Sequence, residues 1–444
     1  MKAFFKSIFL LNRIYYAISI ELLLLIIGFF VPWVYILSQY LLLALGLFVL
    51  TDILILYRNK NGFTAGRETT DKLSNGDVNP IYINLKNNYL FETAVVVIDE
   101  LPFQFQIRDL QFQLKLKSGE AKKLSYDVRP VKRGEYSFGG VNVFVSSPIG
   151  LIQKRYTFSN EMNVPVYPSF IQMRKYELLA ISNQLMLSGI KKIRKIGSNA
   201  EFDQVKEYVQ GDEYRKINWK ATARKNRLMV NQYQDEKSQA VYSVIDMGRV
   251  MKMPFEELSL LDYAINASLV ISNIALLKQD RAGIITFSHK VQSVLPAERR
   301  NAQMHKILEL LYNQKTAYLE SDFERLYIQV KRTVPHRSLL LLYTNFESLT
   351  AMQRQLNYLR RLAKDHLLVV IFFENTELVE FASKNADTTE EIYNKVVAEK
   401  FVYEKRIIVR ELEKYGIHSI LTSPQKLSIN TINKYMELKA RGLI

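Results

Sequence analysis

The chain contains no cysteine, and among its 444 residues it has only two tryptophans and five histidines. The absence of cysteine excludes disulfide bonds, thiolate zinc sites and a cysteine nucleophile. The histidines are scattered, with no two at the spacing typical of metal ligands. The sequence also lacks a Gly-x-x-x-x-Gly-Lys phosphate-binding loop, a Gly-x-Ser-x-Gly nucleophile elbow and a His-Glu-x-x-His helix. We therefore expect no cofactor.

Charge is strongly unbalanced, because 60 lysines and arginines face 44 aspartates and glutamates and give a net charge of +16. Such a balance favours contact with anionic lipid, nucleic acid or an acidic protein partner. For a protein held at the inner leaflet of a membrane, anionic lipid is the simplest of these explanations.

Two long apolar runs near the N-terminus, "YYAISIELLLLIIGFFV" and "WVYILSQYLLLALGLFVLTDILILY", are each close to the length that a spanning helix needs. Pro32 lies in the very short link between them, so residues 1–60 are predicted to form a transmembrane helical hairpin. No small-residue cleavage site follows the first run, which argues against a cleaved signal peptide.

Basic residues flank the predicted hairpin on one side only. Lys2, Lys6 and Arg13 precede it, Arg58, Lys60 and Arg67 follow it, and the link has none. The positive-inside rule then predicts a two-pass protein of the cell membrane, with both termini and the soluble domains in the cytoplasm.

Two acidic residues accompany the spans. An acid within a span is a candidate functional group by default. We expect Asp52 to reach the interface from a helix end, whereas for Glu21 the functional and structural interpretations are both open.

Residues 66–170 show short runs with alternating apolar side chains, punctuated by glycine, asparagine and proline. In "FQFQLKLK", Phe112, Leu114 and Leu116 share one face of the predicted strand. This pattern predicts a β-sandwich-like middle domain. It contains no cluster of acids, bases and nucleophiles, which favours a spacer or binding module over a catalyst.

Residues 171–237 are predicted to form a basic linker followed by a dense polar motif. The basic cluster Lys191, Lys192, Arg194 and Lys195 could bind phosphate groups. It is short and lacks aromatic stacking partners, so a solvated linker near the membrane is the simpler interpretation, and we expect no nucleic-acid binding.

The polar motif reads "EFDQVKEYVQGDEYRKINWKATARKNRLMVNQYQDE". We expect Asp212 to cap a helix over "EYRKINWKATARK". Acidic and basic residues are interleaved, which fits an ion-pair network that pins the segment to the next domain. The alternative is a partner-binding surface. The candidate residues are Glu201, Phe202, Tyr208, Gly211, Asp212, Arg215, Trp219, Lys220 and Arg224.

This motif, the following "LMVNQYQDE" and a strand ending in "VID" closely resemble the signature of the domain of unknown function 58 (DUF58) family. Lys206 stands where that family usually has arginine. The upstream "RPVKRGEYSFGGVNVFVSSPIGLI" is similar to the family's β region. The resemblance implies a von Willebrand factor A-like domain and a gene neighbourhood shared with a MoxR-type AAA+ ATPase.

Residues 238–444 alternate near-continuous apolar runs with helical stretches. The runs "AVYSVID", "RAGIITF", "RSLLLLYTN", "HLLVVIFF" and "IHSILT" are typical of buried parallel strands. The alternation predicts a doubly wound α/β domain, whose ligands bind at the carboxyl ends of the strands. The resemblance makes this domain von Willebrand factor A-like.

Asp246 ends the first of these strands. A metal site of the von Willebrand type needs an aspartate and two serines on the first loop, a threonine on a second loop and an aspartate on a third. Here Gly248 and Val250 replace the two serines, Ser321 is a candidate for the threonine position, and Asn345 replaces the second aspartate. One carboxylate, one hydroxyl and one amide make a poor Mg²⁺ cage, so we predict a degenerate metal site.

These observations predict a non-catalytic, membrane-anchored adaptor or scaffold. By resemblance, its partner is a MoxR-type AAA+ ATPase acting in envelope complex assembly or stress response. Two alternatives are a metal-dependent enzyme that uses Asp246, and a lipid or nucleic-acid binder that uses the basic linker.

Overall fold

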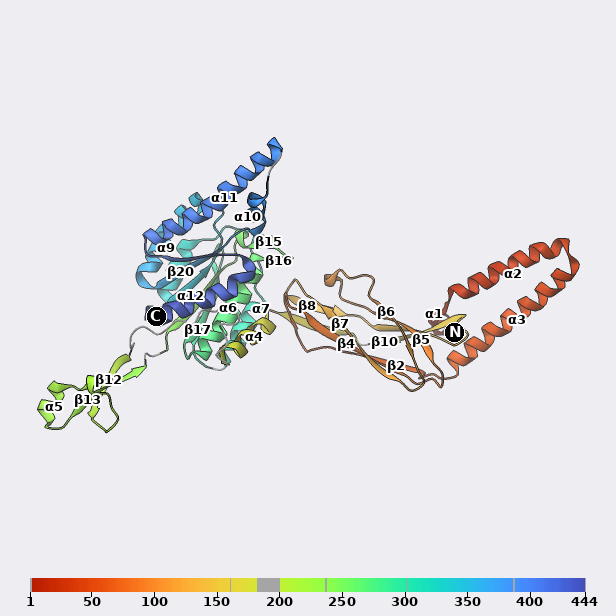
Figure 1. Cartoon of the computed structure of the whole chain (residues 1–444), viewed down its shortest axis with the longest axis horizontal. Helices are drawn as coiled ribbons and strands as arrows, with labels where there is room; N and C mark the ends of the chain where they lie inside the picture. Colours follow the sequence, from red (N-terminus) through yellow and green to blue (C-terminus); the bar gives the residue numbers. More distant parts are fainter. Residues whose placement is uncertain are drawn as a thin grey trace. The chain divides into compact units, whose positions relative to one another are not determined.

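The computed structural model describes residues 2–159, 161–181, 200–235, 238–300, 302–385 and 388–443. These residues form two compact units, Met1–Tyr167 and Pro168–Ile444. The first contains two apolar helices and a β-rich region, and the second is an α/β unit with a mixed sheet (Figure 1).

The first unit begins with α1 (Lys2–Ser7), β1 (Ile8–Leu10), α2 (Asn12–Phe30) and α3 (Pro32–Tyr57). Both α2 and α3 are long and apolar enough to cross a membrane, and only 17% and 11% of their most apolar windows are buried. The two helices approach closely where they meet, because a Cβ added at Gly28 would lie 2.9 Å from the Cα of Tyr35. The predicted pair of membrane helices is therefore present as a hairpin.

The β-rich region is built from three sheets around one apolar core. The largest sheet has the order β1, β10 (Ile152–Phe158), β9 (Val141–Ser146), β5 (Thr93–Asp99) and β6 (Gln111–Leu116). A second has the order β2 (Phe63–Glu68), β4 (Asn79–Asn87) and β7 (Ala121–Val128). The third has the order β3 (Leu73–Ser74), β11 (Met162–Tyr167) and β8 (Gly134–Phe138). A short 3₁₀ helix, η1 (Phe103–Phe105), precedes β6.

The end of α3 is fastened to the β-rich region by hydrogen bonds to polar groups that would otherwise be unsatisfied. Tyr89 and Lys154 both donate to the carbonyl of Leu56, at 2.7 and 3.1 Å. Asp52 is fully buried and accepts the backbone N–H groups of β10 at Ile152 and of the preceding Leu151. The carbonyl of Leu56 lies in the last turn of α3 and has no partner within the helix. Together with the bonds to Asp52, these contacts tie the end of α3 to the β-rich region.

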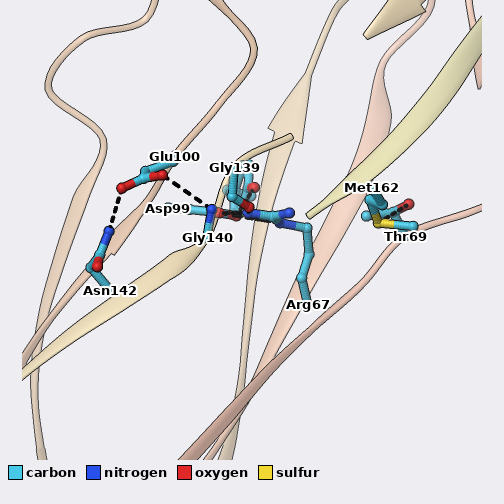
Figure 2. A network of polar contacts seen from close by, with 9 residues as sticks. Arg67, Thr69, Asp99, Glu100, Gly139, Gly140, Asn142 and Met162 are labelled. Atoms are coloured by element: carbon cyan, nitrogen blue, oxygen red, sulfur yellow. Dashed lines mark hydrogen bonds and ion pairs between the residues drawn. The ribbon is translucent and has the colours of Figure 1, made fainter. Parts of the chain in front are cut away.

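Figure 2 shows a buried polar network that joins three strands of this region. The guanidinium of Arg67 on β2 pairs with Asp99 at the end of β5, and both side chains are inaccessible to solvent. Arg67 also donates to the carbonyl of Gly139 at 3.0 Å, and Tyr126 of β7 donates to Asp99. Next to the pair, Glu100 accepts from the amide of Asn142 at 2.6 Å.

Replacing Arg67 by methionine should destabilise the β-rich region by about 3–5 kcal/mol, because the buried Asp99 would lose its counter-charge. The double variant R67M/D99N should lose less, since no uncompensated charge remains. The exposed pair Lys123–Glu68 provides the control, and K123M should cost about 1 kcal/mol or less. Hydrogen–deuterium exchange of β2 and β5 in the full chain measures these differences. Equal protection in R67M and K123M would contradict the account.

The second unit is organised by a six-stranded sheet with the order β18-β17-β14-β19-β20-β21. Its strands are β14 (Ala240–Asp246), β17 (Arg281–Phe287), β18 (Val291–Glu298), β19 (Leu339–Tyr343), β20 (Leu367–Phe373) and β21 (His418–Thr422). The five apolar runs seen in the sequence form the parallel strands, whereas β18 pairs antiparallel with β17 at the edge. The sheet is therefore mixed.

Helices cover both faces of this sheet (Figure 1). One apolar core contains α6 (Leu260–Leu277), α7 (Ala302–Tyr312) and α12 (Leu427–Ala440). The other contains α8 (Phe323–Thr333), α9 (Leu349–Asp365) and the end of α11 (Thr389–Lys414). Helix α6 is apolar enough to span a membrane, but 72% of its most apolar window is buried, as a core helix requires.

The remaining elements of the second unit are short or lie at its margins. Helix α4 (Phe170–Ile181) packs against α6, and α10 (Thr376–Ser383) packs against α11. The loop after β14 contains η4 (Arg249–Lys252) and the small ribbon β15 (Pro254–Phe255) with β16 (Leu258–Ser259), and η5 (Pro424–Lys426) precedes α12. Residues 200–235 form a separate hairpin, which carries the polar motif.

Candidate functional site

The polar motif folds as a β-hairpin. Strand β12 (Ala200–Glu207) pairs antiparallel with β13 (Met229–Asp235), with a bulge between Phe202 and Gln204. The connection contains η3 (Tyr214–Lys216) and the short helix α5 (Trp219–Lys225). Both pack against β13. We call residues 200–235 the signature hairpin.

The helix expected over residues 213–225 is split at Ile217 and Asn218, so that prediction was wrong. Ile217 bridges to Val230 of β13, and the side chain of Asn218 caps α5 by accepting from the N–H of Ala221. Asp212 instead closes a tight turn, where its carboxylate accepts from the N–H of Val209 at 3.0 Å. That bond, aided by Lys206, holds the pKa of Asp212 below its usual value.

Gly211 makes this turn possible, because its φ of +114° is accessible to glycine and strained for other residues. Beside the turn, the ring of Tyr208 stacks on that of Tyr214 with the centroids 5.6 Å apart. Glu201 and Phe202 lie on β12, in register with Gln234 and Tyr233. The basic cluster Lys191, Lys192, Arg194 and Lys195 lies outside the described residues.

The end of the signature hairpin exposes large aromatic side chains. Trp219 is 69% exposed and Tyr214 is 75% exposed, although both residues belong to ordered elements. Only Met229 and Val230 are buried among the hydrophobic residues whose side chains the structure describes in this hairpin. The hairpin therefore leaves most of its apolar surface in contact with water.

Charge at this end is not balanced. The carboxylates of Glu207, Asp212 and Glu213 pair with Arg227, Lys206 and Lys216 respectively. Four further cations form no ion pair with any residue that the structure describes: Arg215, Lys220, Arg224 and Lys225. Each of these three ion pairs joins two residues of the hairpin itself, so none of them pins the segment to the next domain as expected. Exposed cations remain around Trp219.

The second candidate site lies at the carboxyl end of β14. Asp246 is 1% exposed, and its two oxygens accept three hydrogen bonds. Oδ1 accepts from the N–H of Gly248 at 2.8 Å and from the hydroxyl of Ser321, and Oδ2 accepts from the hydroxyl of Thr344 at 2.7 Å. Burial raises the pKa of Asp246, while these three hydrogen bonds oppose the shift.

Asn345, which replaces the second aspartate of a metal site, binds elsewhere. Its side-chain oxygen accepts from the ammonium of Lys405 at 2.8 Å, and that ammonium also donates to the carbonyl of Phe346. A serine at position 248 would also clash, since a Cβ there would lie 2.1 Å from the hydroxyl oxygen of Ser321.

The hollow beside Asp246 measures about 110 Å³ and is lined by Ser321, Thr344 and Asn345 among others. No group of three or more histidine, cysteine, aspartate or glutamate side chains comes together within the described ranges. Donors take three of the about four acceptor sites of the Asp246 carboxylate. Gly248 and Val250 offer no side-chain oxygen, and the oxygen of Asn345 accepts from Lys405. The residues present therefore do not fit Mg²⁺.

Two residues of this region were missed by the sequence interpretation. Thr344 directly follows the apolar run of β19, where a hydroxyl is easily taken for a loop residue. Lys405 lies within the charged helix α11, and the spacing along that helix does not distinguish it from its exposed neighbours.

Comparison with known proteins agrees with the resemblance seen in the sequence. The model of the family "Protein of unknown function DUF58" matches residues 204–381. The "Uncharacterized protein YeaD" of Bacillus subtilis is 25% identical over 297 residues, which cover 64% of this chain and 69% of that protein. The assignment to the DUF58 family is confirmed.

Solved structures are only distantly similar. The conserved hypothetical protein BatB from Bacteroides thetaiotaomicron aligns with 46% of this chain and 100% of its own, at 13% identity and a TM-score of 0.32. The CARDB domain of PF1109 from Pyrococcus furiosus aligns with 24% of this chain and 94% of its own, at 17% identity and a TM-score of 0.17. These likenesses do not establish a von Willebrand factor A-like fold.

The burial of Asp246, which raises its pKa, predicts that a neutral isostere is tolerated. D246N should be at least as stable as the wild type at pH 7, whereas D246A should lose about 1–3 kcal/mol because buried donors lose their acceptor. A carboxyl whose pKa rises on folding weakens the fold as pH increases from its unfolded pKa, about 3.9, through its folded pKa. The stability advantage of D246N should therefore grow over that window and then stay constant.

Urea denaturation of the full chain in detergent at several pH values measures this advantage. Calorimetric titration with Mg²⁺ should give no binding heat in either protein. Micromolar Mg²⁺ binding that D246N abolishes would contradict the account and restore the metal-dependent enzyme.

Proposed function

We propose that this member of the DUF58 family is a membrane-anchored adaptor without catalytic activity of its own, which binds a protein partner through the signature hairpin. The observation that carries the proposal is the exposed Trp219 among cations that form no ion pair with the side chains that the structure describes. Tryptophan and arginine dominate the binding energy of many protein interfaces.

The chemistry of the hairpin selects the kind of partner. Its uncompensated cations fit an acidic protein surface, and the indole of Trp219 supplies the apolar anchor. The family resemblance makes a MoxR-type AAA+ ATPase our choice of partner. Such an enzyme would supply the ATP hydrolysis for which this chain has no phosphate-binding loop.

The α/β unit would serve as the body that presents the hairpin. We take it to be a von Willebrand factor A-like domain whose metal site has been replaced by hydrogen-bond donors. The position of Asp246 at the end of β14, with Ser321 and Thr344 turned toward it, supports this interpretation. A closed network of this kind stiffens the loops without a metal ion.

The helical hairpin would hold the adaptor at the membrane, with both soluble units in the cytoplasm. Because the chain has no cysteine, single cysteines can test this topology without background. A cysteine at the exposed position Lys122 should react with a membrane-impermeant maleimide only after the cells are permeabilised. A cysteine at Trp33, in the first turn of α3, should react in intact cells. The reverse pattern would contradict the proposed orientation.

Binding of the full chain in nanodiscs to the purified MoxR-type ATPase tests the docking face. W219A and R215A should each weaken binding about tenfold or more, since hot-spot residues contribute about 2 kcal/mol or more. Two variants serve as matched controls. F103A removes an aromatic ring that is even more exposed than Trp219 from the β-rich region, and R227A removes a hairpin cation that is already paired.

Biolayer interferometry gives the dissociation constants, and circular dichroism verifies folding. Loss of affinity in F103A equal to that in W219A, or unchanged affinity in W219A, would rule out this docking face.

A further inference from the structure

A further candidate binding site lies in the α/β unit, distinct from the signature hairpin and from the Asp246 network. A cavity of about 300 Å³ opens where β19 and β20 end, beside the ribbon β15–β16 and the helices α10 and α11. In open α/β sheets, the carboxyl ends of the strands are where ligands bind. Neither the Asp246 network nor the proposed docking of the hairpin uses this cavity.

The walls of the cavity are mostly apolar. The hydrophobic side chains that line it include Phe255, Leu260, Phe373, Leu378, Phe401 and Val402. Lys405 also lines it, but its ammonium is engaged by Asn345 and by the carbonyl of Phe346. Burial lowers the pKa of this lysine to about 8. The interior therefore offers space for an apolar group.

Three carboxylates surround this apolar space, from Glu347, Glu374 and Glu377. None of them forms a direct ion pair with a basic residue in the part of the chain that the structure describes. On a chain of net charge +16, this opening is locally acidic. An acidic rim around an apolar cavity is complementary to a ligand that carries an apolar group next to a positive charge.

The cavity shares Val402 with a second, more open hollow between α10 and α11, which Val396 and Tyr403 also line. Phe401 lines the cavity and is itself partly exposed, and Tyr393, Val396 and Tyr403 are exposed on the same helix. In the first four turns of α11, only Ala398 is buried. A continuous apolar surface of this kind fits a peptide segment better than it fits a small metabolite.

We propose that this cavity binds a peptide segment of a protein partner. An aromatic or aliphatic side chain of that segment enters the cavity, and an adjacent lysine or arginine contacts the carboxylates of Glu347, Glu374 and Glu377. The partner surface would thus be basic, whereas the signature hairpin requires an acidic one. The adaptor would bind two chemically different surfaces through two separate sites.

Ligand-observed NMR on the full chain in nanodiscs tests the proposal with short probes. N-acetyl-Phe-Arg-amide should bind with a millimolar dissociation constant. N-acetyl-Phe-Glu-amide and N-acetyl-Gly-Arg-amide should bind at least about tenfold more weakly, because each lacks one of the two recognised groups. Equal binding of the arginine and glutamate probes, or no binding of the first probe, would overturn the proposal.

Variants of the chain locate the binding event. E347Q/E374Q/E377Q should weaken binding of the first probe about tenfold by removing the acidic rim. V402W should abolish it by filling the cavity, since Val402 lines the cavity and is only half-buried. The control E320Q/E390Q/E413Q removes the same charge from exposed positions outside the cavity and should bind as the wild type does. Binding that persists in V402W would place the probe elsewhere and overturn the assignment.

The same variants distinguish a separate partner from a second copy of this chain, whose hairpin also carries an indole among cations. Mass photometry in nanodiscs or detergent should give the same oligomeric state for the wild type and V402W. If V402W instead separated an oligomer into monomers, the occupant would be a second copy and a separate partner would be ruled out.

Discussion

The buried carboxylate of Asp246 is the constraint on which the α/β unit depends. It lies at the end of the central strand β14 and joins that strand to the loops that carry Ser321 and Thr344. A carboxylate in this position must be satisfied by a metal ion or by hydrogen-bond donors. Here donors fill the role, so the sheet edge is complete without a metal.

The fold leaves two surfaces of this unit uncovered, the end of the signature hairpin and the cavity beside Lys405. A hairpin as short as residues 200–235 cannot bury aromatic side chains by folding on itself, so Trp219 and Tyr214 stay exposed. The cavity beside Lys405 lies where α10 and α11 meet the ends of β19 and β20. In the proposed function, the opposite charges of the two surfaces would let one anchored chain distinguish an acidic partner from a basic one. In the other unit, the bonds around Asp52 fasten the membrane hairpin to the β-rich region.

Much of this architecture can be predicted from the sequence, because buried side chains recur with the period of the helix or strand that carries them. The parallel strands, the helices α6 to α9 and the membrane hairpin all follow from apolar spacing. Strand β18 was missed because it is a half-exposed edge strand that contains Pro296. The contact of Ser321 with Asp246 was foreseen from residue types, but the contact of Asn345 with Lys405 was not. Contacts between residues far apart in the chain produce no periodic pattern in the sequence. The cavity therefore could not be predicted from the sequence.

Hydrogen–deuterium exchange of the full chain in nanodiscs, with and without the MoxR-type ATPase, is the most direct test of the adaptor. The account predicts slower exchange in residues 205–231, which contain η3 and α5, when the ATPase is present. Exchange around Asp246 should not change. Unchanged exchange in the hairpin at saturating ATPase, or slower exchange confined to the Asp246 loops, would contradict the central claim.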